Sequence, residues 1–337
     1  MKEKLIIIMM LAILATSLSA CGNKEASSLP DKVRVGIIRV PNDTSVAIKE
    51  QYFGKYFDQK GVEVEYIFFD SGVSANQAFL AGAIDFAEMG FTNGLVALAN
   101  DLPVKLIWIH EILGTNEALV VRDSSLNSLE ELKGKKIATV FSSTAHLSLL
   151  KALEMNNMSE KDTSLLNMET AEIVAAWERG DIDAAYTWEP TLSRISQTGK
   201  VLLSSADLAE QGVLTANIRL VHTDFAKKYP DLVTDFISAL SEAGDLYRSD
   251  PPKAIQSAAN YLGISYEDAM RQMDGSKWLT REEQLSSSYM GDGGDFLKSF
   301  SSAGDYWYQQ GFINRQLTES EIREFIDTTY IKESLEK

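Results

Sequence analysis

Strand-like and helix-like segments alternate along most of this 337-residue chain, and that alternation limits the fold more than any other feature of the sequence. Segment 33–40 is apolar and rich in β-branched residues, as buried strands are, and segment 45–58 predicts a helix after it. Further strands are predicted over 62–69, 84–87, 104–110 and 117–121, with helices that end at Ala81 and cover 92–99. Alternation of this kind is typical of a mostly parallel sheet with helices on both faces.

A second set of alternating segments begins after Arg122. Ser128-Leu129-Glu130-Glu131 matches a capping box and predicts a short helix that ends at Gly134. Strands are predicted over 136–141, 182–188 and 217–221, and helices after Thr144 and over 172–179. The tail predicts helices over 231–247, 252–261, 265–273, 280–290, 294–310 and 318–332, and those at 280 and 318 open with Thr-x-x-Glu. The order predicts an α/β fold of two lobes, with a ligand cleft between them at the carboxyl ends of strands.

The composition excludes several classes of function. The chain has 48 acidic and 32 basic residues, a formal net charge of −16. Because nucleic-acid binding and charge-driven docking on anionic lipid both need a basic surface, we expect neither. One cysteine cannot form an intrachain disulfide or a cysteine-rich zinc site, and the three histidines lack metal-ligand spacing. Since G-x-S-x-G, P-loop and G-x-G-x-x-G motifs are also absent, we expect no metal site, no cofactor and no catalytic residues.

The first twenty residues have the pattern of an export signal. Lys2 and Lys4 precede an apolar run over 5–15, which is too short for a stable membrane anchor. Leu18-Ser19-Ala20-Cys21 is similar to a lipobox, where a lipoprotein is lipidated on cysteine and cleaved before it. We predict a lipoprotein signal peptide over 1–20, lipidation at Cys21, a flexible tether over 21–31 and an extracytoplasmic, lipid-anchored location. An ordinary signal peptide with an incidental cysteine is the alternative.

Small hydroxyl residues and glycines gather where predicted strands pass into helices. These residues are Ser71, Gly72, Gly90, Thr92, Ser142, Ser143 and Thr144. The backbone N–H groups and the dipole at a helix start favour a bound anion. Taken alone, each hydroxyl is better explained as a plain N-cap, which stabilises a helix by about 1 kcal/mol. Three such junctions in series favour an anion-binding site in the cleft.

Larger side chains at other strand ends are further candidates. Trp188 is a candidate wall of the ligand site, with core packing as the alternative, and Glu189 after it is a candidate partner for a cation or an exposed helix-start carboxylate. Glu117 precedes a strand at a predicted crossing between lobes, where it would bind an ammonium group or a hinge lysine. His110 and Glu111 are predicted to be a surface pair.

Four stretches, 70–74, 116–121, 142–151 and 175–190, carry a family resemblance, and the last reads AAWERGDIDAAYTWEP. They are similar to the taurine-binding proteins of sulfonate ABC importers, within a wider family that takes up taurine, alkanesulfonates, nitrate and thiamine precursors. The resemblance runs from residue 33 to at least 285. It implies a two-lobed periplasmic-binding-protein fold (type II-like) that closes on its ligand by hinge bending. Lobe 1 would cover 32–123 and 212–337, and lobe 2 would cover 124–211. The implied ligand contacts are Ser71, Ser142, Thr144, Trp188 and Glu189.

The resemblance is incomplete at two positions, where taurine binders place an aspartate and an aromatic residue and this chain has Asn217 and Arg219. Strand alternation puts both side chains on one face, so both are candidate cleft residues. A surface position near the hinge is the alternative for Arg219. An amide binds ammonium less well than a carboxylate, and an arginine in the cleft would favour a second acidic group or a neutral tail on the ligand.

The leading hypothesis is a solute-binding receptor of an ABC importer, and not an enzyme. It would bind a small organosulfonate, taurine or a related alkanesulfonate, and deliver it as a monomer to permease and ATPase subunits. Another small anion or a thiamine precursor as the ligand, or a non-transport sensor on the same fold, are alternatives. An enzyme like the family members that make a thiamine precursor is disfavoured, because those carry a cysteine- and histidine-rich segment and the one cysteine here, Cys21, lies outside the predicted folded part.

Overall fold

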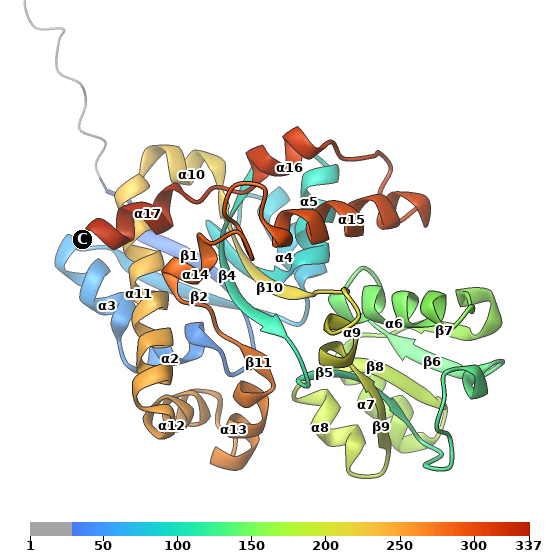
Figure 1. The fold of residues 1–337 in the computed structure, drawn as a ribbon. Helices are drawn as coiled ribbons and strands as arrows, with labels where there is room; N and C mark the ends of the chain where they lie inside the picture. The colour runs from blue at the N-terminus through green and yellow to red at the C-terminus, as the bar shows by residue number, and fades with distance from the viewer. Residues whose placement is uncertain (1–28) are drawn as a thin grey trace, which may run out of the picture. The chain divides into compact units, whose positions relative to one another are not determined.

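The computed structural model describes residues 29–337, so the predicted signal peptide, Cys21 and most of the predicted tether lie outside the described residues. Asp31–Lys337 form one compact unit that contains two β-sheets with helices around them (Figure 1). In this part of the chain, every helix is too short or too polar to cross a membrane. Over the same residues, no group of histidine, aspartate or glutamate side chains is arranged to hold a metal ion.

The two sheets divide the strands almost in chain order. The first sheet contains β1 (Lys32–Ile38), β2 (Glu63–Phe69), β3 (Phe86–Gly90), β4 (Val104–Leu113), β10 (Ala216–His222) and β11 (Ser276–Lys277). The second sheet contains β5 (Glu117–Val121), β6 (Lys136–Thr139), β7 (Ser164–Asn167), β8 (Ala184–Trp188) and β9 (Lys200–Ser204). Their orders are β11-β4-β10-β3-β1-β2 and β7-β6-β8-β5-β9. We call the first sheet with its helices lobe 1, and the second sheet with its helices lobe 2.

Both sheets are mixed, where the alternation predicted mostly parallel ones. In lobe 1, β1 pairs in parallel with β2 and β3, but β10 runs antiparallel to β3 and β4. In lobe 2, β6 pairs in parallel with β7 and β8, but β5 runs antiparallel to β8 and β9. The chain enters β5 and β10 directly after crossing from the other lobe. The neighbouring strands end at the crossing with their carboxyl ends, whereas β5 and β10 begin there. These two strands therefore run opposite to their neighbours.

The chain crosses between the sheets after β4 and again before β10 (Figure 1). β5 pairs with β8 from Glu117 opposite Trp188 to Val121 opposite Ala184, so it belongs to lobe 2. The prediction that lobe 1 continues to residue 123 is therefore wrong, and lobe 2 begins before Glu117. Strand patterning alone could not reveal this, because a strand's sequence shows its burial and not the sheet with which it pairs.

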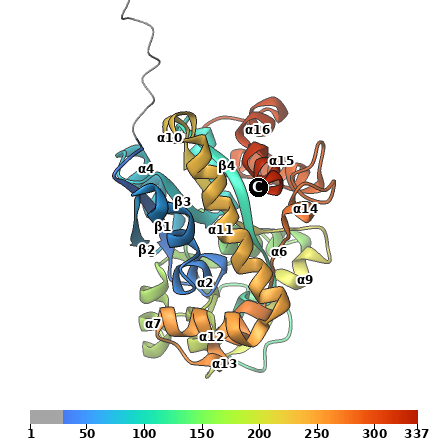
Figure 2. The same ribbon diagram turned by 90° about the vertical axis from the view of Figure 1, so that its left-hand side faces the viewer.

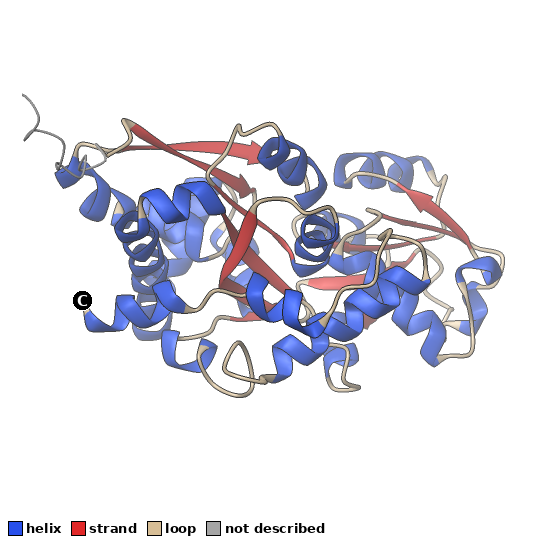
Figure 3. Ribbon diagram, turned by 90° about the horizontal axis from the view of Figure 1, so that it is seen from above, coloured by secondary structure: helices blue, strands red, loops and turns tan. Residues whose placement is uncertain are grey.

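Helices lie on both sides of the strands (Figure 3). Those between the strands are α2 (Asp43–Lys49), α3 (Tyr52–Phe57), α4 (Gly72–Leu80), α5 (Phe91–Ala99), α6 (Thr144–Met155), α7 (Thr170–Arg179), α8 (Thr191–Ser196) and α9 (Ser205–Ala209). Those of the tail are α10 (Thr223–Lys228), α11 (Pro230–Ser249), α12 (Pro251–Leu262), α13 (Tyr266–Asp274), α14 (Arg281–Gln284), α15 (Asp295–Gln309), α16 (Glu319–Phe325) and α17 (Thr329–Glu336). Three short 3₁₀ helices are η1 (Asp58–Lys60), η2 (Glu130–Leu132) and η3 (Glu160–Asp162). The long helix α11 packs against α2 and α3 (Figure 2).

Several predicted helices differ from the structure at their ends. The helix predicted over 45–58 is broken at Gln51, whose φ of 60° is left-handed, so α2 and α3 are separate. The capping boxes at Thr280 and Thr318 are confirmed, yet the helices behind them are shorter than predicted. The box at Ser128 begins only η2, where Glu131 accepts hydrogen bonds from the backbone of Asn127 and Ser128.

The two lobes share a buried apolar seam. Leu147 and Leu150 of α6, in lobe 2, pack into the same hydrophobic cluster as the core of lobe 1. Beside them, the His146 ring lies 4.8 Å from the Phe312 ring and 5.7 Å from the ring of Trp307 in α15, measured between centroids. We call these five residues the interlobe seam. It joins the tail of lobe 1 to a helix of lobe 2, whereas the rest of the lobe 2 core forms two clusters of its own.

Candidate ligand-binding site

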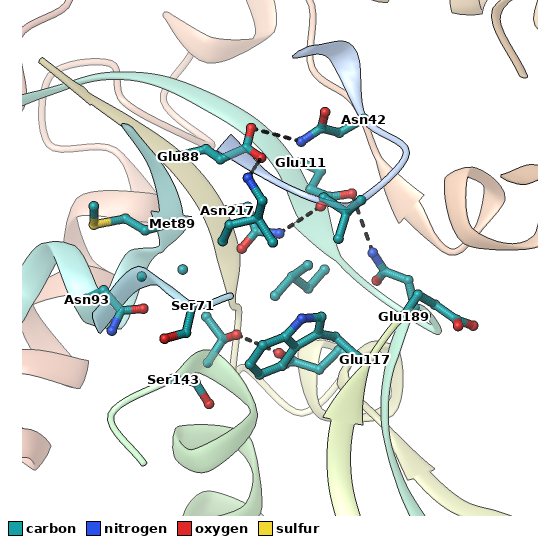
Figure 4. Close-up of a pocket in the computed structure, with 18 of the residues that line it drawn as sticks. Asn42, Ser71, Glu88, Met89, Asn93, Glu111, Glu117, Ser143, Glu189 and Asn217 are labelled. Carbon is teal, nitrogen blue, oxygen red and sulfur yellow. Dashed lines mark hydrogen bonds between the residues drawn. The ribbon is translucent and has the colours of Figure 1, made fainter. Parts of the chain in front are cut away.

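A cleft lies between the lobes, where the carboxyl ends of strands from both sheets meet (Figure 4). Its empty volume, open mouth included, is about 730 Å³. The predicted site residues that line it are Ser71, Gly72, Glu117, Ser143, Thr144, Trp188, Glu189 and Asn217. Among the described residues that line the cleft there is no lysine, arginine or histidine, so a ligand's charge would meet backbone, hydroxyl, amide and carboxylate groups.

One end of the cleft is rich in hydrogen-bond donors. Helix α4 starts at its N-cap Ser71, whose side chain makes no capping hydrogen bond, and helix α6 starts at its N-cap Ser143. The first N–H groups of a helix have no acceptor within the helix, so each start presents free donors and the positive end of a dipole. Figure 4 shows Ser71, Asn93 and Ser143 on the same side of the cleft. The helix starts come from opposite lobes, so an anion between them would contact both.

Close packing fixes the geometry of this donor-rich end. A Cβ on Gly72 would lie 2.4 Å from Oδ1 of Asn93, and one on Gly90 would lie 2.9 Å from Cγ2 of Thr144. Only glycine therefore fits at these two positions. Nδ2 of Asn93, in lobe 1, donates to the backbone oxygen of Ser142, in lobe 2, at 3.2 Å. The two lobes are thus in direct contact at this end of the cleft.

The other end of the cleft is rich in hydrogen-bond acceptors. Glu111, at the end of β4, is 3% exposed and accepts from Nδ2 of Asn217 at 2.7 Å and from Nδ2 of Asn116 at 3.4 Å. Burial raises the pKa of the Glu111 carboxyl, and Ser276 and Asn217 oppose the rise. Oε1 of Gln272, also in the cleft wall, is buried and has no hydrogen-bond partner among the described residues. These acceptors have no basic side chain bonded to them, which suits an ammonium group.

Apolar side chains lie between the two ends. Trp188 ends β8, lines the cleft, and packs against the lobe 2 core on its partly buried side. Met89, Val140 and Leu113 complete the apolar surface. This spacing leaves room for a short carbon chain between a donor-rich and an acceptor-rich end.

Glu189 lines the cleft, but its carboxylate is held by helix α8. Oε2 accepts from the backbone N–H of Ser193 at 2.9 Å and Oε1 accepts from its hydroxyl at 2.8 Å. Burial raises the pKa of Glu189 while these bonds lower it. At 6% exposure it is not the exposed carboxylate of the alternative reading, and both oxygens already have donors.

Arg219 does not line the cleft, and it is not a surface residue either, so both readings of it were wrong. It is 0% exposed, and its Nη2 donates to Oε2 of Glu88 at 2.9 Å and to Thr44 at 2.7 Å. Glu88 does line the cleft and also accepts from Nδ2 of Asn42 at 3.1 Å and from the backbone N–H of Ile38 at 2.6 Å. Arg219 therefore neutralises and orients Glu88 from behind the cleft wall.

Three further predictions are corrected by the structure. Thr92 is 0% exposed inside α5 and does not line the cleft. Ser142 is partly exposed and is not part of the lining either; it has a left-handed conformation with φ of 65°, and its backbone N–H donates to Nδ1 of His146. His110 and Glu111 are 2% and 3% exposed and so are not a surface pair. His110 is bonded to buried Asp43, and only Glu111 faces the cleft.

The sequence interpretation missed several cleft residues. They are Asn42, Glu88, Asn93, Glu111, Asn116 and Gln272. The rule that ligands bind at the carboxyl ends of strands could have found Glu111, which directly follows the predicted strand 104–110. Gln272 had no such signal, because α13 reaches the cleft from the tail helices, 161 residues beyond Glu111 in the numbering.

Comparisons with known proteins agree with the resemblance seen in the sequence. Residues 52–254 match the family model described as NMT1/THI5 like. The taurine-binding periplasmic protein of Escherichia coli (strain K12) is 33% identical over 245 residues, which are 71% of this chain and 75% of that protein. A Bacillus subtilis (strain 168) protein with a provisional aliphatic sulfonates-binding name is 25% identical over 342 residues, covering 100% of this chain and 98% of its own.

A solved structure shows the same fold. The alkanesulfonate-binding protein SsuA from Xanthomonas axonopodis pv. citri, bound to MOPS, superposes with a TM-score of 0.74 at 20% identity. The match covers 88% of this chain and 99% of that one. Together with the family model and the relatives, it shows that this chain belongs to the NMT1/THI5-like family and has its two-lobed fold.

Proposed function

We propose that this chain is the substrate-binding receptor of an ABC importer and that it binds a small organosulfonate in the interlobe cleft. The observation that carries the proposal is the polarity of the cleft. Helix starts from both lobes lie at one end, and the carboxylate of Glu111 lies at the other with no basic partner among the described residues. The names of the relatives, taurine-binding and sulfonate-binding, support the same ligand class.

The ligand would lie along this polarity. Its sulfonate oxygens would accept from the N–H groups at the starts of α4 and α6 and from the hydroxyl of Ser71. The Ser143 hydroxyl already donates to the backbone oxygen of Val140, so Ser143 would act by holding the start of α6 in place. Its carbon chain would pack against Trp188. An amine, where the ligand has one, would bind Glu111 and Asn217. This assignment replaces Glu117 and Glu189 as the amine partners, because Glu189 is already bonded to Ser193 and Glu117 is bonded to hydroxyls.

Delivery to the importer would follow from closure of the two lobes. The two crossings between the sheets are the natural hinges, because few residues there must change conformation. The direct contact between Asn93 and Ser142 is one that opening of the cleft would break. We further propose a monomer, anchored outside the cytoplasm by lipid on Cys21, whose partners are the permease and ATPase subunits.

A thermal-shift titration with a set of ligands tests the proposal. The set is taurine, ethanesulfonate, isethionate, sulfoacetate, nitrate and a thiamine pyrimidine. A ligand at 100 times its dissociation constant stabilises the fold by about 2.7 kcal/mol, which is easily measured. We expect taurine and at least one amine-free sulfonate to stabilise it. A shift with nitrate or the pyrimidine alone would overturn the sulfonate assignment, and chemical change of a bound sulfonate, seen by mass spectrometry, would overturn the receptor role.

A pair of matched variants tests the orientation of the ligand. Glu111→Gln should weaken taurine binding by at least tenfold while ethanesulfonate, which has no amine, keeps its affinity. Glu189→Gln removes a cleft carboxylate that is turned toward Ser193, so it should leave both affinities within about twofold. Equal losses of taurine affinity in the two variants would contradict the amine site at Glu111.

A further inference from the structure

Glu117 is a buried carboxyl surrounded by hydroxyl groups. It starts β5, is 1% exposed, and lines the cleft. One of its oxygens accepts from the Thr144 hydroxyl, and the other accepts from Ser205 at 2.7 Å and from Ser148 at 3.4 Å. A hydroxyl donates one proton and accepts through its lone pairs, so each of these partners could also accept a proton from Glu117.

Charge around Glu117 favours a bound proton. Glu111 on β4 is a second buried carboxyl, and its charge raises the pKa of Glu117. Tyr186 on β8 and His146 on α6 are both neutral at pH 7, because burial raises the pKa of the phenol and lowers that of the imidazole to about 4. Asp207 in α9 is bonded to Ser204. No basic group is bonded to Glu117 among the described residues. Burial is the main effect and raises the pKa of Glu117 to about 7, although the hydrogen bonds from Thr144, Ser205 and Ser148 lower it.

Thr144 connects this carboxyl to the ligand site. Of the three hydroxyl residues bonded to Glu117, Thr144 lines the cleft and Ser148 and Ser205 do not. When Glu117 is ionised, the one hydroxyl proton of Thr144 is directed at the carboxylate and its lone pairs remain for the cleft. When Glu117 is protonated, it can donate to Oγ1 of Thr144, and the Thr144 proton is free for a ligand oxygen.

We propose that Glu117 is a positioning residue that carries a proton while an anion occupies the cleft, and that this proton directs the Thr144 hydroxyl to the anion. The inference rests on the proposed function, since it needs an anion at the start of α6. The stoichiometry is simple: binding takes up to one proton from solvent onto Glu117, and release of the anion returns it.

This coupling gives anion affinity a definite pH dependence. A ligand that binds only the protonated form raises the pKa of Glu117, so its dissociation constant is constant well below pH 7. Above pH 7 the dissociation constant rises, and the rise approaches about tenfold for each pH unit. The reason is that the fraction of protein with Glu117 protonated, the form that binds, falls tenfold for each pH unit. Proton uptake on binding rises over the same interval from near zero to near one.

Isothermal titration calorimetry of the purified protein with ethanesulfonate tests the proposal between pH 5.5 and 8.5. This probe has no group that titrates in that range. Two buffers of different ionisation enthalpy at each pH give the number of protons taken up. We expect uptake near zero at pH 5.5 and near one at pH 8.5, with the dissociation constant rising at least tenfold. A flat dissociation constant with no proton exchange would overturn the inference and leave the receptor intact, whereas no binding of any sulfonate at any pH would remove the proposed function itself.

Three variants assign the effect to its atoms. Glu117→Gln keeps a donor toward Thr144 and cannot ionise, so it should bind with the low-pH affinity of the unchanged protein at every pH. Thr144→Val removes the hydroxyl and should weaken binding at pH 5.5 while abolishing the pH dependence. Glu111→Gln, the matched change at the other end of the cleft, should keep the pH dependence.

Two outcomes would refute the role of Glu117. One is a tenfold loss of ethanesulfonate affinity in Glu117→Gln at pH 5.5 with a native circular dichroism spectrum. The other is loss of the pH dependence in Glu111→Gln. If Glu117→Gln does not fold, a pH dependence that persists in Thr144→Val would refute it.

Discussion

Buried polar residues decide what this cleft can bind. The charge of each one depends on the cost of its burial and on the hydrogen-bond partners that offset that cost. Arg219 is a full charge at 0% exposure, and it is tolerated because Glu88 and Thr44 accept its hydrogen bonds. Glu111 has amide donors and no cation, so it keeps the capacity to bind one. A chain of −16 net charge can therefore present a cleft in which anion binding depends on helix starts and not on basic side chains.

His146 provides a residue-scale prediction about stability and pH. Burial lowers its pKa to about 4, against about 6.5 in an unfolded chain, so the unfolded state binds more protons between these values. Stability therefore rises with pH through this window, is fully present above pH 6.5, and is lost as pH falls toward 4. The contribution is about 3 kcal/mol at most.

The variant His146→Phe isolates this contribution. Phenylalanine keeps the stacking on Phe141 but has no proton to bind, and it loses the hydrogen bond from the Ser142 backbone. In urea unfolding at pH 7, the variant should have the lower free energy of unfolding. Between pH 7 and pH 4.5, the difference between variant and unchanged protein should shift by about 2 kcal/mol in favour of the variant. A constant difference between the two proteins at both pH values would contradict a buried neutral imidazole.

At the scale of elements, the starts of helices serve both folding and binding. Ser143 caps α6, where its oxygen accepts from the backbone N–H of His146 at 3.2 Å, and it also lines the cleft. Thr318 caps α16 in the same way, accepting from Glu321 at 3.2 Å, but it is not part of the cleft lining. The same N-cap hydrogen bond therefore occurs once at the proposed site and once away from it.

Alanine at these two caps separates the two roles. Ser143→Ala and Thr318→Ala should each lower the free energy of unfolding by about 1 kcal/mol, because each leaves a helix-start N–H without its acceptor. Only Ser143→Ala should also weaken sulfonate binding, by about fivefold or more, as measured by calorimetry. If Thr318→Ala weakened binding as much, the loss would reflect general destabilisation, and Ser143 would be a cap alone.

At the scale of the molecule, the interlobe seam joins two lobes that the cleft separates. Trp307 is 0% exposed and packs beside His146 and Phe312, while Lys151 of α6 lies 3.7 Å from the ring centroid of Tyr306 in α15. The tail of lobe 1 is thus bound to the helix that starts at the donor-rich end of the cleft. Because Leu147 and Leu150 of α6 pack into the core of lobe 1, we expect the two lobes to unfold together.

Calorimetric unfolding of two tryptophan variants tests that coupling. Trp307→Ala should cost about 3–5 kcal/mol and divide a single transition into two, because it empties the seam. Trp177→Ala removes a similar volume from the cluster between α7 and the second sheet, inside lobe 2, and should lower the transition temperature while leaving one transition. Two transitions already present in the unchanged protein would contradict coupling through the seam.

The sequence by itself determined the features that depend on neighbours along the chain. The strands other than β7, β9 and β11, the capping boxes at Thr280 and Thr318, and the small residues at the starts of α4 and α6 could be predicted, because periodicity and capping act over a few residues. Only the tertiary structure decided that β5 belongs to lobe 2, that β5 and β10 run in reverse, and that Gln272 faces the cleft. It also decided that Arg219 is buried against Glu88, a partner 131 residues away. Strand pairing, burial and ion pairing join residues that are distant in the chain, and a local pattern carries no record of such partners.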